Sequence, residues 1–155
     1  MSLSEFLFSP RGRINRAKYW LFALVGGAIL VVLVGVVAVA FAGFIHDPRG
    51  GAGFPIGAIV IIAIVYLFFL IVSIFVGIKR LHDRDKSGWW LLVFYLGPAI
   101  LSGISEVLSR NGIGILFALA SLGISIWAFV ELGCLRGTIG PNRYGEDPLA
   151  ARQPA

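Results

Sequence analysis

The stretch KRLHDRDKSGWW, residues 79–90, is the densest run of charge in the chain, and a long apolar run lies on either side of it. Such apolar runs predict membrane-spanning helices, because a helix needs about 20 consecutive apolar residues to cross the hydrocarbon core of a bilayer. Charged residues between two spans mark a loop, and their sign indicates which side of the membrane that loop faces.

The composition also indicates a membrane protein. The 155 residues are 58% hydrophobic and 14% charged, whereas a soluble domain is about 45–50% apolar and about 25% charged. The net charge of +5 does not indicate nucleic-acid binding, because the basic residues cluster at the ends of the apolar runs. The single cysteine, Cys134, excludes an intrachain disulfide.

We therefore predict an all-α membrane protein with four transmembrane helices. No alternating pattern of barrel strands is present, and the first apolar run is longer than the roughly 7–15 residues of a signal peptide's apolar region. The expected parts are a basic and aromatic interfacial segment at 1–20, a transmembrane domain at 21–135, and a Gly/Pro-rich cytoplasmic tail at 136–155. The expected spans are at about 21–45, 54–78, 89–107 and 113–135, with a cytoplasmic loop at 79–88.

Lys and Arg are distributed unequally between the two sides of the membrane. Four crossings place the N-terminal segment, the 79–88 loop and the tail on one side, together with eleven of the thirteen basic residues. Only Arg49 and Arg110 lie on the other side. The positive-inside rule then predicts that both termini are cytoplasmic.

Three polar motifs lie on that predicted cytoplasmic face. The first is GRINR at 12–16 followed by YW at 19–20, and the second is RLHD at 80–83 followed by SGWW at 87–90. The third is in the tail, with GT at 137–138, Gly140, NRYG at 142–145 and DP at 147–148. From about Phe8 to Pro148, this combination resembles the domain-of-unknown-function 805 family, the YhaH/YhaI-like small bacterial inner-membrane proteins. The resemblance implies four membrane helices and a multi-pass location in the bacterial inner membrane, and it implies no activity.

The favoured hypothesis is a small-ligand or anionic-lipid binding or scaffold protein. Arginine offers a planar, always-charged fork suited to phosphate or carboxylate, and basic pockets at the cytoplasmic side of helices bind anionic headgroups. Arg13, Arg16 and Trp20 would share one face if their segment is helical. The candidate ligand-binding residues are Arg13, Arg16, Trp20, Arg80, His82, Asp83, Trp89, Trp90, Asn142, Arg143 and Asp147. The expected partners are membrane lipids, including anionic headgroups, and no nucleic acid, while a homo-oligomer is compatible with the sequence.

One alternative is a membrane-embedded enzyme acting on a lipid-like substrate, with His82 as general base and Asp83 or Asp147 orienting it. Adjacent residues on a helix point apart, so His82 and Asp83 do not form a dyad by themselves. A nucleophile elbow and a set of metal ligands are both missing from the sequence pattern. We therefore assign no catalytic residue, metal or cofactor.

Two further alternatives remain open. The chain could be a subunit of an oligomeric transporter or channel, with Glu131, the only acid inside a predicted span, and Pro98 lining a pore. An intramembrane acid can equally serve a structural pair, for example with Arg80 or Arg136. The motifs themselves could also be structural, tying the loop and the tail to the helix ends, because ion-pair networks gather at non-functional sites too.

Overall fold

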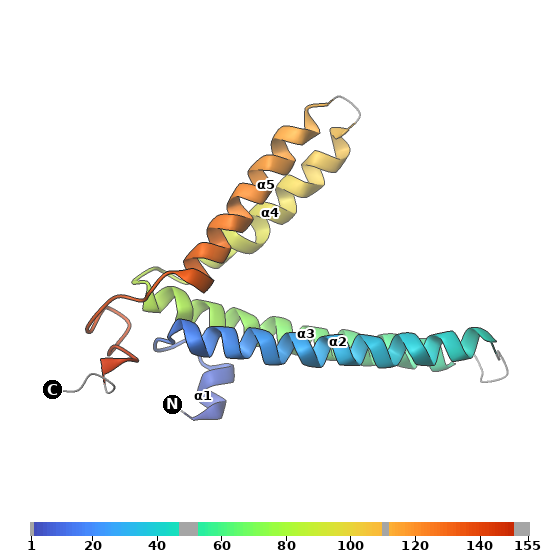
Figure 1. Ribbon diagram of the computed structural model, residues 1–155, viewed down its shortest axis with the longest axis horizontal. Coiled ribbons are helices and arrows are strands. Elements are labelled where there is room, and N and C mark those ends of the chain that lie inside the picture. Colours follow the sequence, from blue (N-terminus) through green and yellow to red (C-terminus); the bar gives the residue numbers. More distant parts are fainter. Residues whose placement is uncertain (1, 47–52, 110–111, 151–155) are drawn as a thin grey trace. The chain divides into compact units, whose positions relative to one another are not determined.

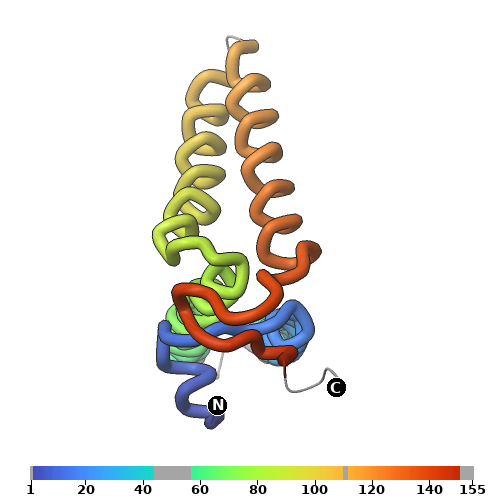
Figure 2. The backbone as a smooth tube through the Cα atoms, turned by 90° about the vertical axis from the view of Figure 1, so that its left-hand side faces the viewer, coloured from blue at the N-terminus to red at the C-terminus, as the bar shows by residue number. Residues whose placement is uncertain are grey.

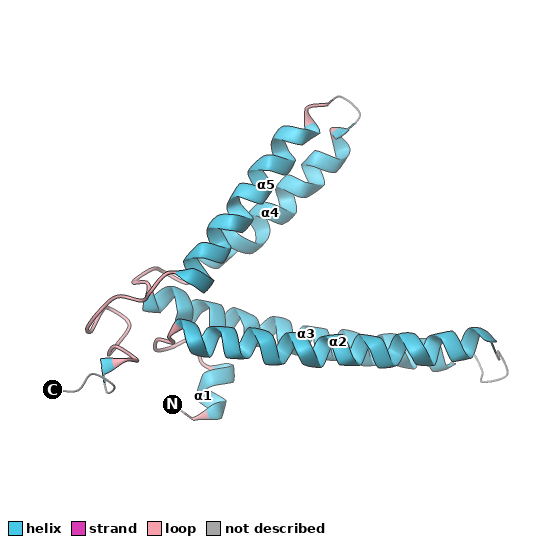
Figure 3. Ribbon diagram, viewed as in Figure 1, coloured by secondary structure: helices cyan, strands magenta, loops and turns pink. Residues whose placement is uncertain are grey.

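The structure is a computed structural model that describes residues 2–46, 53–109 and 112–150, and only the backbone of 44–46 and 53–56. The described chain is helical apart from its connections and tail (Figure 3). The helices are α1 (Leu3–Phe8), α2 (Arg16–His46), α3 (Gly53–Asp83), α4 (Trp90–Val107) and α5 (Gly114–Phe129), followed by the π-helical turn η3 (Val130–Cys134) (Figure 1). Asn142 and Gly145 form an isolated antiparallel bridge in the tail.

Four of these helices are long and apolar enough to cross a membrane. Their spanning parts are Arg16–Gly43, Gly57–Asp83, Trp90–Val107 and Gly114–Cys134. Most of their large apolar side chains are exposed, as expected when lipid rather than protein covers them. The prediction of an all-α protein with four transmembrane helices is therefore confirmed, while the orientation of the termini stays a prediction.

The chain divides into two compact units. One unit is residues 21–73, which comprise most of α2 and α3. Within it the two helices approach closely at Gly26, where an added Cβ would lie 3.0 Å from the ring of Phe69. Phe22 also packs on Phe69, with ring centroids 6.5 Å apart.

The other unit is residues 1–20 and 74–155, which contain the three polar motifs. Its helices α4 and α5 lie side by side (Figures 1 and 2). A small apolar core of Leu81, Leu91, Phe94 and Leu132 lies where these helices meet the end of α3. Further along the pair, the Ser121 hydroxyl donates to the carbonyl of Pro98 at 3.0 Å, so a polar contact links the proline-containing α4 to α5.

The N-terminal segment forms a short helix of its own. The side chain of Ser2 accepts the N–H of Glu5, and the Glu5 carboxylate accepts the N–H of Ser2, which is a capping box. At the other end of α1, the fully buried Lys79 donates to the carbonyls of Glu5, at 2.9 Å, and Phe6. A lysine from the last turns of α3 therefore holds α1 in place.

Two local expectations differ from the structure. Arg13 precedes the first residue of α2 and is not helical, so it does not share a helix face with Arg16 and Trp20. The α3 helix continues through the beginning of the expected loop and ends at Asp83. This continuation places Arg80 and Asp83 one turn apart on the same helix, where they form an ion pair.

Candidate functional site

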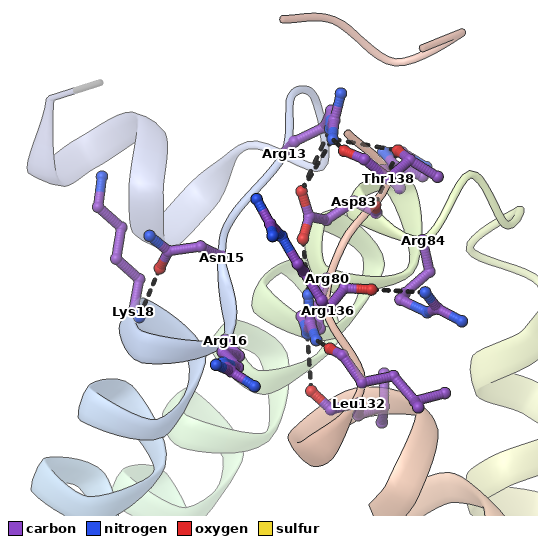
Figure 4. A network of polar contacts seen from close by, with 12 residues as sticks. Arg13, Asn15, Arg16, Lys18, Arg80, Asp83, Arg84, Leu132, Arg136 and Thr138 are labelled. Carbon is purple, nitrogen blue, oxygen red and sulfur yellow. Dashed lines mark hydrogen bonds and ion pairs between the residues drawn. The ribbon is translucent and has the colours of Figure 1, made fainter. Parts of the chain in front are cut away.

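Asp83 lies between two buried arginines at the end of α3 (Figure 4). Its Oδ1 is 3.2 Å from Nη2 of Arg13, and its Oδ2 is 2.6 Å from Nη1 of Arg80. The exposed fractions of the three side chains are 3% for Asp83, 1% for Arg13 and 0% for Arg80. We call these three residues the Asp83 cluster, and burial of this kind requires that each charge be paired and hydrogen-bonded.

Arg13 uses its remaining donors on the tail. Its Nη1 donates to the carbonyls of Gly140 at 2.7 Å and Gly145 at 3.1 Å. Its Nη2 donates to the carbonyl of Thr138 at 2.6 Å. The guanidinium fork therefore contacts a carboxylate and three backbone carbonyls at once, and it holds the tail against the end of α3.

The carbonyls at the end of η3 and just after it accept hydrogen bonds from side chains elsewhere in the sequence. The last carbonyls of a helix have no partner within that helix. Here the last three carbonyls of η3 and the next two along the chain accept such donors. The pairs are Arg80 Nε with Leu132 O at 2.7 Å, Trp20 Nε1 with Gly133 O at 3.0 Å, Arg16 Nη1 with Cys134 O at 3.4 Å, Arg80 Nη2 with Leu135 O, and Arg84 Nη1 with Arg136 O at 2.5 Å.

Gly137 permits the close approach of the tail to the Asp83 cluster. A Cβ at this position would lie 2.0 Å from Oδ2 of Asp83. A carboxylate of the protein itself therefore occupies the space beside this glycine. Two other tail glycines, Gly140 and Gly145, have φ values of +78° and +130°, which side chains disfavour.

The tail turn has its own polar contacts. The N–H of Thr138 donates to the carbonyl of Asp83 at 2.8 Å, and Nδ2 of Asn142 donates to the carbonyl of His82 at 2.8 Å.

The Asp147 carboxylate accepts the N–H of Leu149 at 2.9 Å and of Gly140 at 3.1 Å. These two backbone donors lower the pKa of Asp147, because they stabilise its charged form.

His82 packs in a way that does not suit a general base. Its ring stacks on Tyr144 with centroids 3.8 Å apart and planes 4° apart. Its Nδ1 is enclosed and has no hydrogen-bond partner among the described residues. Both oxygens of the neighbouring Asp83 accept hydrogen bonds from arginines, so that carboxylate is not available to orient the imidazole.

Glu131 is buried in η3 and pairs with the loop that follows α3. Its oxygens are 3.0 Å from Nε of Arg84 and 3.1 Å from Nζ of Lys86. These partners differ from Arg80 and Arg136, the two that the sequence suggested. The Lys86 ammonium also lies over the rings of Trp90 and Trp127, at 5.7 and 5.9 Å from their centroids.

The structure gathers most, but not all, of the candidate residues. Eight contact the tail, the end of α3 or η3, and they are Arg13, Arg16, Trp20, Arg80, His82, Asp83, Asn142 and Asp147. Arg143 is on the surface and pairs with Asp85 at 3.1 Å. Trp89 is 76% exposed, and Trp90 contacts Lys86 instead of the tail.

Sequence reasoning missed several contributors to this region. In the sequence, Arg84 and Lys86 contribute only to the predicted topology, while Arg136 contributes to it and is also a suggested partner of Glu131. The partners of Arg84, Lys86 and Lys79 are distant in sequence. They are Glu131 and the carbonyls of Arg136, Glu5 and Phe6, and no residue pattern identifies such pairs. Thr138 belongs to a quoted motif, and that motif was the available signal for its role.

A small cavity of about 170 Å³ lies between the start of α2 and the tail. Its walls include Asn15, Arg16, Arg136 and Thr138, with Asp83 and Asp147 on the same lining. Within the described ranges, no group of three or more His, Cys, Asp or Glu residues could hold a metal ion. The chemistry that this region offers is therefore that of arginine side chains beside a polar cavity.

Four helices long and apolar enough to cross a membrane define the chain as a multi-pass membrane protein. A family model described as "Protein of unknown function (DUF805)" matches residues 7–146, and the chain belongs to this family.

The chain is similar to three proteins of Escherichia coli K12. It is 27% identical to "Uncharacterized protein YiiR", with 95% of this chain and 90% of that protein covered. It is 29% identical to "Inner membrane protein YhaI", with 88% and 83% covered. It is 27% identical to "Inner membrane protein YhaH", with 89% and 85% covered. No solved structure matches. The predicted family and the multi-pass inner-membrane location are both confirmed.

Proposed function

We propose that this inner-membrane protein binds anionic phospholipids at the polar end of the unit formed by residues 1–20 and 74–155. One observation carries the proposal. Four exposed cations, Arg11, Arg16, Lys18 and Arg136, form no ion pair with any acidic side chain among the described residues. They flank the start of α2 and follow η3, where apolar spans begin and end.

The buried arginines are already paired, so the four exposed cations are the ones available to bind a lipid headgroup. Arg13 and Arg80 are buried, and both donate to Asp83. Arg13 also donates to tail carbonyls, and Arg80 to the carbonyls of Leu132 and Leu135. They therefore hold the fold together and are not free to bind a ligand. Unpaired cations at a membrane surface attract anionic headgroups by about 1 kcal/mol each. We therefore keep the hypothesis of anionic-lipid binding, and we assign the binding to the exposed cations instead of the buried arginines.

Lipid selection by the full chain tests this proposal. The protein would be purified from a detergent mixture containing equal amounts of phosphatidylglycerol and phosphatidylcholine, and the retained lipids would be counted by native mass spectrometry. We expect phosphatidylglycerol to be enriched on the wild type. The double variant Arg11→Gln, Lys18→Gln should reduce the enrichment several-fold, because two unpaired cations are removed.

The matched control is Arg143→Gln. It also removes an exposed cation, but one whose charge Asp85 already neutralises, so the enrichment should change little. Raising the salt concentration should weaken the enrichment on the wild type, since exposed charges are screened. Equal retention of the two lipids by the wild type would contradict the proposal.

A further inference from the structure

The cavity beside Arg16 and Arg136 has features of a defined binding site rather than of a charged surface. We propose that it holds one phosphate group, with Arg16 and Arg136 as its cationic ligands. This inference rests on the proposed function and narrows it from a surface preference to a single stoichiometric site. In the sequence, Arg136 contributes to the predicted topology and is a suggested partner of Glu131, but it is not among the candidate ligand-binding residues.

The two arginines are cations on the cavity wall, and each has N–H donors without an acceptor in the described part of the chain. Among the described residues, the Arg16 side chain makes one long hydrogen bond, from Nη1 to the carbonyl of Cys134 at 3.4 Å. The side chain of Arg136 forms no hydrogen bond or ion pair with the described part of the chain. A guanidinium matches phosphate oxygens with two parallel N–H donors, so an arginine with free donors at a cavity wall suits that ligand.

The two acids on the cavity wall do not cancel this charge. Both oxygens of Asp83 accept from Arg13 and Arg80. Both oxygens of Asp147 accept backbone N–H groups. Asp83 carries one negative charge beside the two positive charges of Arg13 and Arg80. Asp147 likewise carries one negative charge against the two positive charges of Arg16 and Arg136. The net charge around the cavity is therefore positive. The cavity is therefore suited to an anion and not to a cation.

The size and position of the cavity indicate a headgroup and not a larger molecule. Its volume of about 170 Å³ is below the range of about 300–1,000 Å³ that is typical for drug-sized ligands. It opens beside the first turn of α2, whose N-terminal end carries a partial positive charge. A phosphate on a phospholipid and a free phosphate ion share the chemistry that this site recognises.

Titration of single variants tests the site. Dihexanoyl phosphatidylglycerol would be titrated into the detergent-solubilised full chain and followed by native mass spectrometry. We expect one saturable equivalent on the wild type. Arg136→Gln should weaken that equivalent about tenfold, because one charge-assisted contact is lost. Folding should be intact, because this side chain forms no hydrogen bond or ion pair in the described part of the chain.

Two further variants make the result specific. Arg143→Gln removes the same charge away from the cavity and should leave the affinity unchanged. Asn15→Asp keeps the cap of α2, since Oδ1 of Asn15 accepts the N–H of Lys18 at 2.9 Å and aspartate caps equally well. It places a negative charge at the cavity wall, so we expect it to weaken binding as Arg136→Gln does.

The outcomes separate this inference from the proposed function. Equal affinity of the Arg136→Gln and Arg143→Gln proteins, or no saturable equivalent on the wild type, would overturn the phosphate site. The proposed function would stand in that case if Arg11→Gln, Lys18→Gln still reduced phosphatidylglycerol enrichment. In a second experiment, inorganic phosphate would be added to the lipid-bound protein. Displacement of the lipid would show that the site binds free phosphate, and lack of displacement would show that it binds the phosphate of a phospholipid.

Discussion

Asp83 shows how one residue organises the polar end of this protein. The spacing of Arg80 and Asp83 predicts their pairing once α3 continues, because residues three apart lie on one helix face. The second arginine, Arg13, is 70 residues away in sequence, and no local pattern links the two. Gly137 completes the arrangement, since only a residue without a side chain fits against the carboxylate.

We predict that Asp83→Asn destabilises the protein by about 3–5 kcal/mol, because it leaves two buried arginines without their counter-charge. Asp85→Asn is the matched control. It breaks the exposed pair with Arg143 and should cost no more than about 1 kcal/mol. Unfolding of both variants in detergent, followed by circular dichroism, checks the difference. Similar losses for the two variants would show that the Asp83 cluster contributes no more than a surface pair.

The tail is an element without regular secondary structure whose position depends on side chains from other elements. Arg13 binds three of its carbonyls, and Asn142 connects it to the last turn of α3. Its own turn is closed by Asp147, through the N–H groups of Gly140 and Leu149. The glycines and prolines of its sequence indicate consecutive turns, but they do not show where these turns dock.

The lowered pKa of Asp147 predicts how the tail responds to acid. A carboxylate whose pKa is lower in the folded state stabilises the fold above its unfolded pKa of about 3.9, and that contribution is lost as the pH falls through the folded value. We expect hydrogen-exchange protection at Gly140 and Leu149 to decrease below about pH 4.

The Thr138 amide, which donates to the carbonyl of Asp83, provides an internal reference for this measurement. Asp147→Asn should abolish the acid-dependent change at Gly140 and Leu149 relative to that reference. If the wild type and Asp147→Asn lost protection over the same pH range, a different group would be responsible for the acid response.

At the scale of the whole molecule, the three polar motifs meet in one unit. Contacts between Arg13, Asp83 and Thr138 bring the N-terminal segment, the 79–88 loop and the tail together. This agrees with four crossings, which return the chain to the side on which it began. The contacts do not depend on which side that is, so the orientation rests on the distribution of Lys and Arg alone.

We predict that both termini lie in the cytoplasm. Green fluorescent protein fused after Ala155 of the full chain should fluoresce in bacterial cells, and alkaline phosphatase fused at the same residue should be inactive, because the phosphatase needs an oxidising compartment for its disulfides. An active phosphatase fusion together with a dark fluorescent one would reverse the assigned topology.

The amino-acid sequence determines that this chain crosses the membrane four times, because lipid admits only helices whose backbone groups are satisfied internally and whose apolar length matches the bilayer. It also shows the polar motifs, and it allowed both a ligand-binding and a structural interpretation of them. The tertiary structure decides how they are used. The buried arginines bind carbonyls and a carboxylate, while Arg136 is left beside a cavity. These contacts join residues far apart in the chain, and many involve backbone atoms that every residue carries, so the pattern of side chains alone cannot specify them.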